Sequence, residues 1–226
     1  MLERIKNPNV LDVYDIFRSK KKIWIFVEYA SGGVLTSRCS REPVPEEKGK
    51  KWFRQIAEAV KYMHCELRIC HRDIKTDNVL LDGKEDAKLS DFGFTRRVEG
   101  SEEVEEPEGI VSTVCGTVPY YSPEVVKAAL KGVPYNGFSA DDWAMGVMLY
   151  AMLTTKWAFR YDPQGSRDSL AIMYRGMKTR AYREKPYFTR LPEGARHLIH
   201  HLLDPDPTTR YTSRKYVRHP WLTQRE

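Results

Sequence analysis

Apolar positions in two parts of the first ninety residues are grouped in short runs, which predict strands beside tight turns. The run from Lys22 to Tyr29 is rich in β-branched and aromatic residues and stops at Ser31-Gly32-Gly33, which predicts a strand followed by a flexible connection. Val79-Leu80-Leu81 and Ala87-Lys88-Leu89 flank an Asp82-Gly83 turn and predict a short hairpin.

Helical spacing is evident in three longer segments. A helix is predicted from Pro45, because proline and two glutamates suit a first turn and the apolar positions that follow are spaced by 3, 4 and 3 residues. Those positions are Phe53, Ile56, Val60 and Met63. Asp141 to Leu153 predicts a buried helix, and Glu193 to Leu203 an amphipathic one.

Composition indicates a folded chain with one large domain or two modest ones, since 41% of its 226 residues are hydrophobic. The net charge is +6, which admits a nucleic-acid or acidic-lipid partner. However, the basic residues are spread along the chain apart from Arg18 to Lys22, which we predict to be a solvated turn. A nucleic-acid-binding module therefore rests on net charge alone, and we expect no nucleic-acid partner.

The cysteines and the hydropathy predict a reduced protein of the cytoplasm or nucleus. The first twenty residues contain no apolar core of a secretion signal, so the four cysteines are expected to be thiols. His64-Cys65 and Cys70-His71 suggest zinc, but their spacing lies outside the usual patterns, and we predict no such site. Trp143 to Leu153 is about half as long as a membrane span, so no membrane partner is expected.

Candidate chemistry is concentrated in the stretch CHRDIKTDNVLL, from Cys70 to Leu81. A charged turn before a strand is one interpretation, because Asp, Asn and Thr favour turns. A catalytic loop is the other, and Asp91-Phe92-Gly93, which begins thirteen residues after Asn78, supports it. His71-Arg72-Asp73, Asn78 and this tripeptide, in this order, resemble the eukaryotic protein kinases.

The resemblance implies roles suited to phosphoryl transfer, which needs positioning and charge neutralisation more than covalent chemistry. Asp73 matches the family's catalytic base, and Lys75 the cation typical of serine/threonine kinases. Asn78 and Asp91 match the residues that hold Mg2+, and Thr117 matches the threonine that contacts the catalytic aspartate. ATP and Mg2+ are thus the implied cofactors, and a protein serine or threonine hydroxyl the implied acceptor.

The resemblance also assigns structural roles. His71 and Phe92 match members of an internal apolar spine, Leu2 and Val13 are its expected upper members, and Gly93 is expected to allow a sharp turn. Motifs further along match the family in order: Ser122-Pro123-Glu124, with Arg210 as the partner of Glu124, then Asp141 with Trp143 and Gly146, and finally His219-Pro220-Trp221.

A loop between these motifs carries candidate regulatory residues. Thr113 matches the position that is often phosphorylated by an upstream kinase, with Ser112 as the alternative, and Arg72 and Arg96 would receive the phosphate. The Glu-rich stretch from Glu99 to Glu108 predicts a solvated spacer, and a shield or pseudo-substrate acting in cis is the alternative.

The nucleotide site is only half recognisable. Glu28 to Ala30 match the hinge that holds adenine, Val27 the gatekeeper, and Leu80 the residue beneath the ring. No two of the fourteen glycines are two residues apart, so no G-x-G exists, and no VAIK-type lysine is recognisable. The pairing glutamate would precede Met1, since Glu3 lies too close to Asn7-Pro8 to replace it. We therefore expect a truncated product, an alternative start or an incomplete gene model, with weak activity of these residues alone.

Three sequence segments indicate the subfamily, and three single positions bear on the substrate preference. FRQIAEAVKYMH, KLSDFGF and GVPYNGFSADDWAMGVMLY are most similar to the testis-specific serine/threonine kinases of the calmodulin-kinase-like group, which implies a role in spermatogenesis. Relatives that prefer arginine before the target hydroxyl have acids where Val34 and Ala151 stand, and only Asp77 keeps its acid. An arginine-directed preference is left open.

The sequence thus predicts an α+β protein-kinase-like fold with one kinase domain. Residues 1–30 are expected to be a remnant of the N-lobe, with the end of a helix, two strands and the hinge, and residues 31–222 a mainly helical C-lobe. We expect a monomeric serine/threonine kinase. The alternative is a catalytically silent scaffold that binds partners through the surface left by the missing strands.

Overall fold

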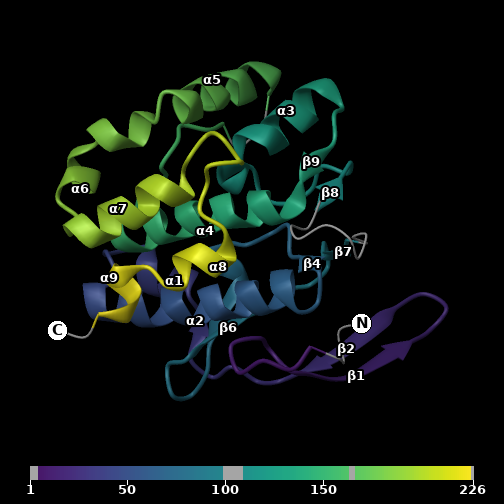
Figure 1. The fold of residues 1–226 in the computed structure, drawn as a ribbon. Coiled ribbons are helices and arrows are strands. Elements are labelled where there is room, and N and C mark those ends of the chain that lie inside the picture. Colours follow the sequence, from purple (N-terminus) through teal and green to yellow (C-terminus); the bar gives the residue numbers. More distant parts are fainter. Residues whose placement is uncertain (1–4, 99–108, 163–165, 225–226) are drawn as a thin grey trace.

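Two long helices, α2 (Glu46–Cys65) and α4 (Gly137–Thr154), lie side by side at the centre of the protein, as the computed structural model shows (Figure 1). The structure describes residues 5–98, 109–162 and 166–224. The predictions for Leu2, Glu3 and Glu99 to Glu108 fall outside these ranges. Helices dominate and the sheets are small, so the predicted α+β class is confirmed.

Helices and 3-10 turns follow one another through most of the chain. Their bounds are α1 (Thr36–Cys39), α2, η2 (Thr76–Asn78), η3 (Val118–Tyr120), α3 (Pro123–Lys131), α4, α5 (Arg167–Lys178), η4 (Ala181–Glu184), α6 (Pro186–Thr189), α7 (Glu193–Leu202), α8 (Ser213–Tyr216) and α9 (Pro220–Thr223). The strands are β1 (Val13–Arg18), β2 (Ile23–Val27), β3 (Gly33–Val34), β4 (Ile69–Cys70), β5 (Val79–Leu81), β6 (Ala87–Leu89), β7 (Arg96–Arg97), β8 (Ile110–Val111) and β9 (Tyr135–Asn136).

The helix α2 begins directly after Pro45 and buries the predicted apolar face. Phe53, Ile56, Val60 and Met63 are all almost fully buried, and this face packs toward α4 and the β5–β6 hairpin. Helix α4 is buried on nearly every side, which explains why its sequence is apolar throughout rather than amphipathic. The predicted amphipathic helix at Glu193 is also confirmed, as α7.

The start of α4 differs from the prediction, which placed it at Asp141. The helix begins four residues earlier, at Gly137, because the side chain of Asn136 caps it by accepting a hydrogen bond from the Ser139 amide at 2.9 Å. Asn136 is therefore the residue that sets the helix start.

Four small antiparallel sheets surround the helices, and each joins short strands. They are β1–β2, β3–β5–β6, β4–β7 and β8–β9. The predicted hairpin is confirmed as β5–β6, and the predicted strand after Lys22 as β2. The segment after the hinge is more ordered than predicted, because Gly33 and Val34 form β3 against β5. Gly32 permits this approach, since a Cβ there would lie 2.8 Å from backbone and side-chain atoms of Leu81.

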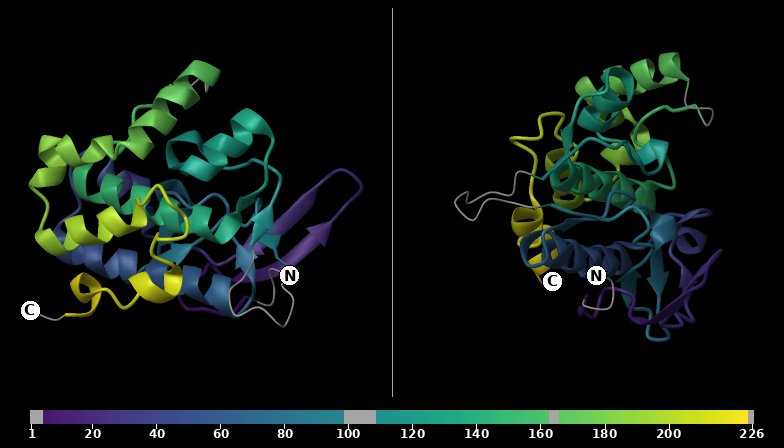
Figure 2. Two further views of the ribbon diagram at one scale, coloured as in Figure 1. Left: turned by 45° about the horizontal axis from the view of Figure 1, so that its top comes forward. Right: turned by 90° about the vertical axis from the view of Figure 1, so that its right-hand side faces the viewer.

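The β1–β2 hairpin projects from one end of the helical body (Figures 1 and 2). Large apolar side chains on both strands are exposed, among them Phe17, Trp24 and Phe26, each by more than half. The connection from Arg18 to Lys22 is also exposed, as the prediction of a solvated turn required. Within the described ranges, no helix combines the length and the apolar composition needed to cross a membrane.

Close packing of α4 on α7 leads to a stability prediction for Gly146. A Cβ at this position would lie 2.7 Å from the Leu202 Cβ, so Gly146→Ala would push the two helices apart. We expect the substitution to lower the free energy of unfolding by about 1–3 kcal/mol, as overpacked cores do, measured by urea denaturation.

Gly176, within α5, provides the matched control, because its nearest contacts would lie at an ordinary 3.9 Å. Gly176→Ala should be neutral or stabilise the protein by up to about 1 kcal/mol through helix propensity. Equal losses in the two variants would contradict the packing argument.

Candidate active site

The loop between β4 and β5 is fixed in place by a buried carboxylate of α4. Asp141 accepts hydrogen bonds from the His71 and Arg72 amides, both at 2.7 Å, and from the His64 ring Nε2 at 3.0 Å. Arg72 has a left-handed φ of 67°, an unfavourable conformation for a residue with a Cβ. The two charge-assisted bonds to Asp141 compensate for this strain and set the direction in which the loop leaves the core.

Asp73 is the centre of a hydrogen-bond network that joins four predicted site residues. Its Oδ1 accepts from the Thr117 hydroxyl at 2.7 Å, and its Oδ2 lies 2.8 Å from Lys75 Nζ and 3.0 Å from Asn78 Nδ2. Lys75 Nζ also donates to the Thr117 hydroxyl at 2.8 Å. The structure therefore brings together Asp73, Lys75, Asn78 and Thr117 from the loop and from the residue before η3.

The network determines the ionisation of Asp73. Burial opposes the charged carboxylate, but the hydrogen bonds from Lys75, Thr117 and Asn78 outweigh it and hold the pKa of Asp73 below its usual value. Near neutral pH the group is thus a carboxylate, which can accept a hydrogen bond from a substrate hydroxyl and orient it.

His71 and Phe92 have structural positions behind this network. The His71 ring is buried, its Nε2 lies 3.0 Å from the Ser90 carbonyl, and its Nδ1 accepts from the Asp73 amide at 3.3 Å. These partners require a neutral ring with its proton on Nε2, and burial lowers the pKa of His71 accordingly. The Phe92 ring lies 5.4 Å from it, and Val13 is buried in β1.

Asp91 and Asn78 present oxygen atoms that suit Mg2+. Asn78 directs its amide nitrogen to Asp73, which leaves its amide oxygen for another partner, and Asp91 is exposed. Mg2+ prefers one or two carboxylates together with phosphate and water oxygens, so both side chains are of the type that the ion takes, although the described contacts do not join Asp91 to Asn78. The left-handed residue is Asp91, with φ 59°, whereas Gly93 forms the following turn and donates to Asp91 Oδ1 at 3.2 Å.

The predicted adenine-binding residues come from the end of β2, the segment that follows it and the central strand β5. Glu28 Oε2 lies 3.0 Å from Lys88 Nζ, and the Glu28 amide donates a hydrogen bond to the Asp12 carbonyl. Val27, the residue before Glu28, is the last residue of β2. Ala30 follows, and its carbonyl accepts from Gly33 at the start of β3. Strand β3 pairs Val34 with Leu80, so the structure brings the segment after the hinge next to Leu80.

The exposed Thr113 lies near one of its two predicted cations. Arg72 donates from NH1 to the Thr113 carbonyl at 3.3 Å, and the Tyr135 hydroxyl donates to the same oxygen at 3.1 Å. Arg96 lies in β7, paired with Cys70, and the described contacts do not join it to Thr113. A phosphate on Thr113 would therefore meet Arg72 first.

Glu124 and Arg210 form a two-pronged ion pair that joins α3 to the segment after α7. Arg210 NH2 lies 3.0 Å from Glu124 Oε2, while NH1 contacts Oε1 and also donates to the Ser139 carbonyl at 2.7 Å. The guanidinium is buried and stacks over the Trp143 ring. Since the pair is buried and bidentate, removal of either partner would leave an uncompensated charge.

Two residues near the site have roles that sequence reasoning missed. Asp142 is buried beside His64, whose Nδ1 lies 3.9 Å from its Oδ1, so His64 is placed between Asp142 and Asp141. Gly116 has a φ of 97°, and a Cβ there would lie 2.5 Å from the Arg72 carbonyl. The close contact between Gly116 and the Arg72 carbonyl depends on how two segments distant in sequence pack, so the sequence alone does not reveal it. Asp142 could have been noticed, because a second aspartate is unusual in an otherwise apolar helix.

His71 is one of the four residues that suggested zinc in the sequence, and its ring has partners within the protein. His71 is fully engaged by Ser90 and Asp73. Among the residues that the structure describes, no group of three or more His, Cys, Asp or Glu side chains is arranged to hold a metal ion.

Comparison with known proteins identifies the family. The family description "Protein kinase domain" matches residues 1–222 of this chain. The chain belongs to the protein kinase family, and its fold is the protein-kinase fold.

Its curated relatives are serine/threonine kinases and CBL-interacting kinases of plants and yeast. CBL-interacting protein kinase 30 of Oryza sativa subsp. japonica is 35% identical over 99% of this chain and 44% of that protein. CBL-interacting serine/threonine-protein kinase 15 of Arabidopsis thaliana is 31% identical, over 96% and 48%. Serine/threonine-protein kinase GIN4 of Saccharomyces cerevisiae is 34% identical, over 98% and 18%. The chain thus spans less than half the length of these relatives.

The buried Asp142 generates a prediction about pH. Burial, assisted by the adjacent Asp141 carboxylate, raises the pKa of Asp142 to about 7. Between about pH 4 and pH 7 the folded protein therefore binds a proton that the unfolded chain has released. This contribution to stability is complete below about pH 4 and is lost as pH rises from about 4 to about 7, by up to about 1.4 kcal/mol per pH unit.

Asp142→Asn, which resembles the protonated carboxyl group, should remove this decline. We expect the two proteins to unfold at similar urea concentrations at pH 4, and the variant to be the more stable at pH 8. Parallel stability curves from pH 4 to pH 8 would show that Asp142 does not titrate in this range.

Proposed function

We propose that this chain is the catalytic part of a serine/threonine protein kinase, which transfers the γ-phosphate of ATP to hydroxyl groups of protein substrates. The observation that supports this most directly is the network of Asp73, Lys75, Asn78 and Thr117. It places an ionised carboxylate, a cation and an amide oxygen in one small region. Phosphoryl transfer requires these groups.

Each residue of the network has a step that its geometry suits. Asp73 would accept a hydrogen bond from the substrate hydroxyl and take up its proton as the phosphate bond forms. Lys75, which now bridges Asp73 and Thr117, would move its ammonium group toward the γ-phosphate. Asn78 and Asp91 would hold Mg2+, which when bound neutralises phosphate charge.

The nucleotide would bind between the two parts of the domain, residues 1–30 and 31–222. Glu28 to Ala30 would contact the adenine edge, with Val27 behind it and Leu80 below the ring. Support comes from the β3–β5 pairing, which holds the segment after the hinge beside Leu80. These 226 residues contain no G-x-G, so we propose that on their own they bind ATP weakly.

A catalytically silent scaffold is the second candidate, and one specific observation favours it. Both strands of the β1–β2 hairpin expose large apolar side chains, which offers a surface for protein partners. In that case the Asp73 network would serve stability alone.

The finer identity is also a proposal. The segments FRQIAEAVKYMH and GVPYNGFSADDWAMGVMLY support membership of the testis-specific kinases, with a role in spermatogenesis. We further propose a monomer of the cytoplasm or nucleus that is activated by an upstream kinase. A preference for arginine before the target hydroxyl would depend on Asp77, because Val34 and Ala151 supply no charge.

Activity can be tested in a chimera that adds a glycine-rich loop and a strand lysine, which are not recognisable in these 226 residues. The part of CBL-interacting protein kinase 30 that precedes its matched region is joined to residue 1 of this chain. We expect Mg2+-dependent phosphorylation of a generic protein substrate, and a loss of about 10²- to 10⁴-fold in Asp73→Asn, because a positioned carboxylate contributes that much.

Glu47→Gln, on the first turn of α2, removes one exposed carboxylate and should leave the rate unchanged. A folded chimera with no activity, or with the same activity after Asp73→Asn, would favour the scaffold. Phosphorylation by the 226 residues alone, lost in Asp73→Asn, would refute our proposal that they bind ATP too weakly to act.

Phosphorylation of Thr113 should order its loop and raise activity. A phosphate on this exposed side chain would meet Arg72, which already binds the Thr113 carbonyl. We expect treatment of the chimera with an upstream kinase to raise kcat at least severalfold and to protect the loop from proteolysis. Thr113→Ala should lose both effects, whereas Ser112→Ala should keep them. The reverse pattern would assign the site to Ser112.

A further inference from the structure

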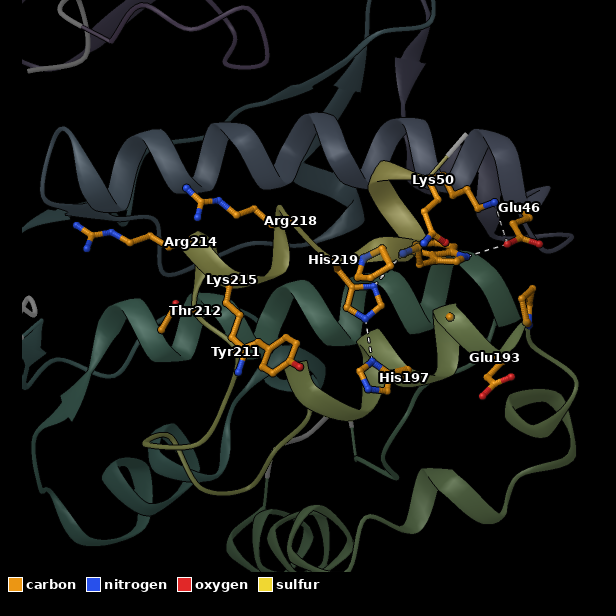
Figure 3. Close-up of a pocket in the computed structure, with 15 residues that line it drawn as sticks. Glu46, Lys50, Glu193, His197, Tyr211, Thr212, Arg214, Lys215, Arg218 and His219 are labelled. Carbon is orange, nitrogen blue, oxygen red and sulfur yellow. Dashed lines mark hydrogen bonds and ion pairs between the residues drawn. The ribbon is translucent and has the colours of Figure 1, made fainter. Parts of the chain in front are cut away.

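A groove with a volume of about 1030 Å3 lies away from the proposed active site, between the first turn of α2, the start of α7 and the α8–α9 segment (Figure 3). Its walls include exposed Pro192 and Pro220. The volume is that of a site for several residues of an extended peptide. Neither the catalytic network nor the nucleotide residues contribute to it.

The two ends of the groove carry opposite charge. Arg214, Lys215 and Arg218 are exposed at one end, and Glu46 and Glu193 lie toward the other (Figure 3). Lys50 lies beside Glu46 and pairs with it at 3.3 Å, which leaves Glu193, among the residues described there, as the uncompensated charge at that end. The Lys215 ammonium is over the Tyr211 ring at 4.0 Å. Within the described part of the chain, no carboxylate forms an ion pair with Lys215 or Arg218. Two cations are therefore available to an anionic ligand.

A chain of hydrogen bonds holds the floor of the groove rigid. The Trp221 indole donates to Glu46 Oε1 at 2.8 Å, and the Trp221 amide donates to His219 Nδ1 at 3.2 Å. Because His219 Nδ1 accepts, its Nε2 carries the proton and donates to His197 Nδ1 at 2.8 Å. Exposed His197 then keeps its second nitrogen as a donor for a ligand.

His219, in the floor of the groove, is neutral at neutral pH. Burial, and then the proximity of His197 and His201, lower the pKa of His219 to about 4. Tyr211 is fixed by stacking on His201, with ring centroids 4.1 Å apart. The positive end of the groove therefore depends on arginine and lysine side chains, and a ligand would meet a preformed surface that needs little ordering.

We propose that this groove docks an acidic segment of another protein. Clustered carboxylate or phosphate groups of that segment would contact Lys215 and Arg218, and an apolar residue next to them would rest on Pro220 and the edge of Trp221. Glu193 decides against a nucleic acid or an anionic membrane, because a polyanion that filled the groove would bring phosphates against this exposed carboxylate. A peptide that is acidic at one end only avoids this repulsion.

The proposal is tested by direct binding, without ATP, so the result does not depend on kinase activity. The probe is a fluorescein-labelled peptide with four glutamates followed by a proline and two leucines, and fluorescence anisotropy at 0.15 M salt measures its affinity. In the double variant Lys215→Glu with Arg218→Glu we expect at least a tenfold loss of affinity, because each substitution replaces an attraction by a repulsion.

Lys20→Glu with Lys21→Glu is the matched control, since it makes the same change of net charge on the exposed β1–β2 connection. The control should change affinity by less than about twofold, and thermal unfolding verifies that both variants are folded. Failure of the wild-type chain to bind the peptide, or equal losses in the two variants, would overturn the proposal. A peptide with glutamine in place of glutamate should bind at least tenfold more weakly.

Other occupants give distinct results, each of which would overturn the proposal. A nucleic acid or a membrane would be the occupant if single-stranded RNA or phosphatidylserine vesicles bound more tightly than the peptide. That binding would also have to be lost in the groove variant, which is Lys215→Glu with Arg218→Glu. A second copy would appear as a dimer in light scattering that the groove variant abolishes. Six of the ten residues from 99 to 108 are glutamate. If their replacement by glutamine tightened peptide binding tenfold or more, the occupant would be this segment of the chain itself.

Discussion

The buried carboxylate of Asp141 is the constraint on which the candidate site depends. It accepts hydrogen bonds from the amides of His71 and Arg72, and it pairs with His64 of α2, so one side chain of α4 joins the two central helices to the loop that carries Asp73. Without it, the left-handed conformation of Arg72 would be strained and uncompensated. The position of Asp73, one residue later, thus follows from the packing of α2 against α4.

Elements governed by local patterns could be predicted, and those governed by distant contacts could not. The apolar spacing after Pro45 predicted α2, and the Asp82-Gly83 turn predicted β5–β6, because both patterns lie within one element. Strand β3 has only two residues and exists because Leu81 lies beside it. Helix α4 begins four residues before the predicted start, because the Asn136 side chain caps it ahead of Asp141.

The same division holds for the site. The order of residues from His71 to Asp91 pointed to a site around Asp73. The structure joins Asp73 to Lys75, Asn78 and Thr117, whereas the described contacts do not join Asp91 to them. The role of Asp142 was not predicted, because a carboxylate in an apolar helix acquires its raised pKa only from the burial that packing creates. Nor was the groove predicted, since its walls come from three segments far apart in sequence.

Helix α2 serves the two sites from its opposite ends. His64, near its last turn, supports Asp141, whereas Glu46, in its first turn, holds Trp221 in the floor of the groove. Between them lies one continuous helix with its apolar face packed on the core, and such a helix transmits little unless it has two arrangements. A partner in the groove would therefore raise the local concentration of a substrate or regulator near the kinase more readily than it would change the geometry around Asp73.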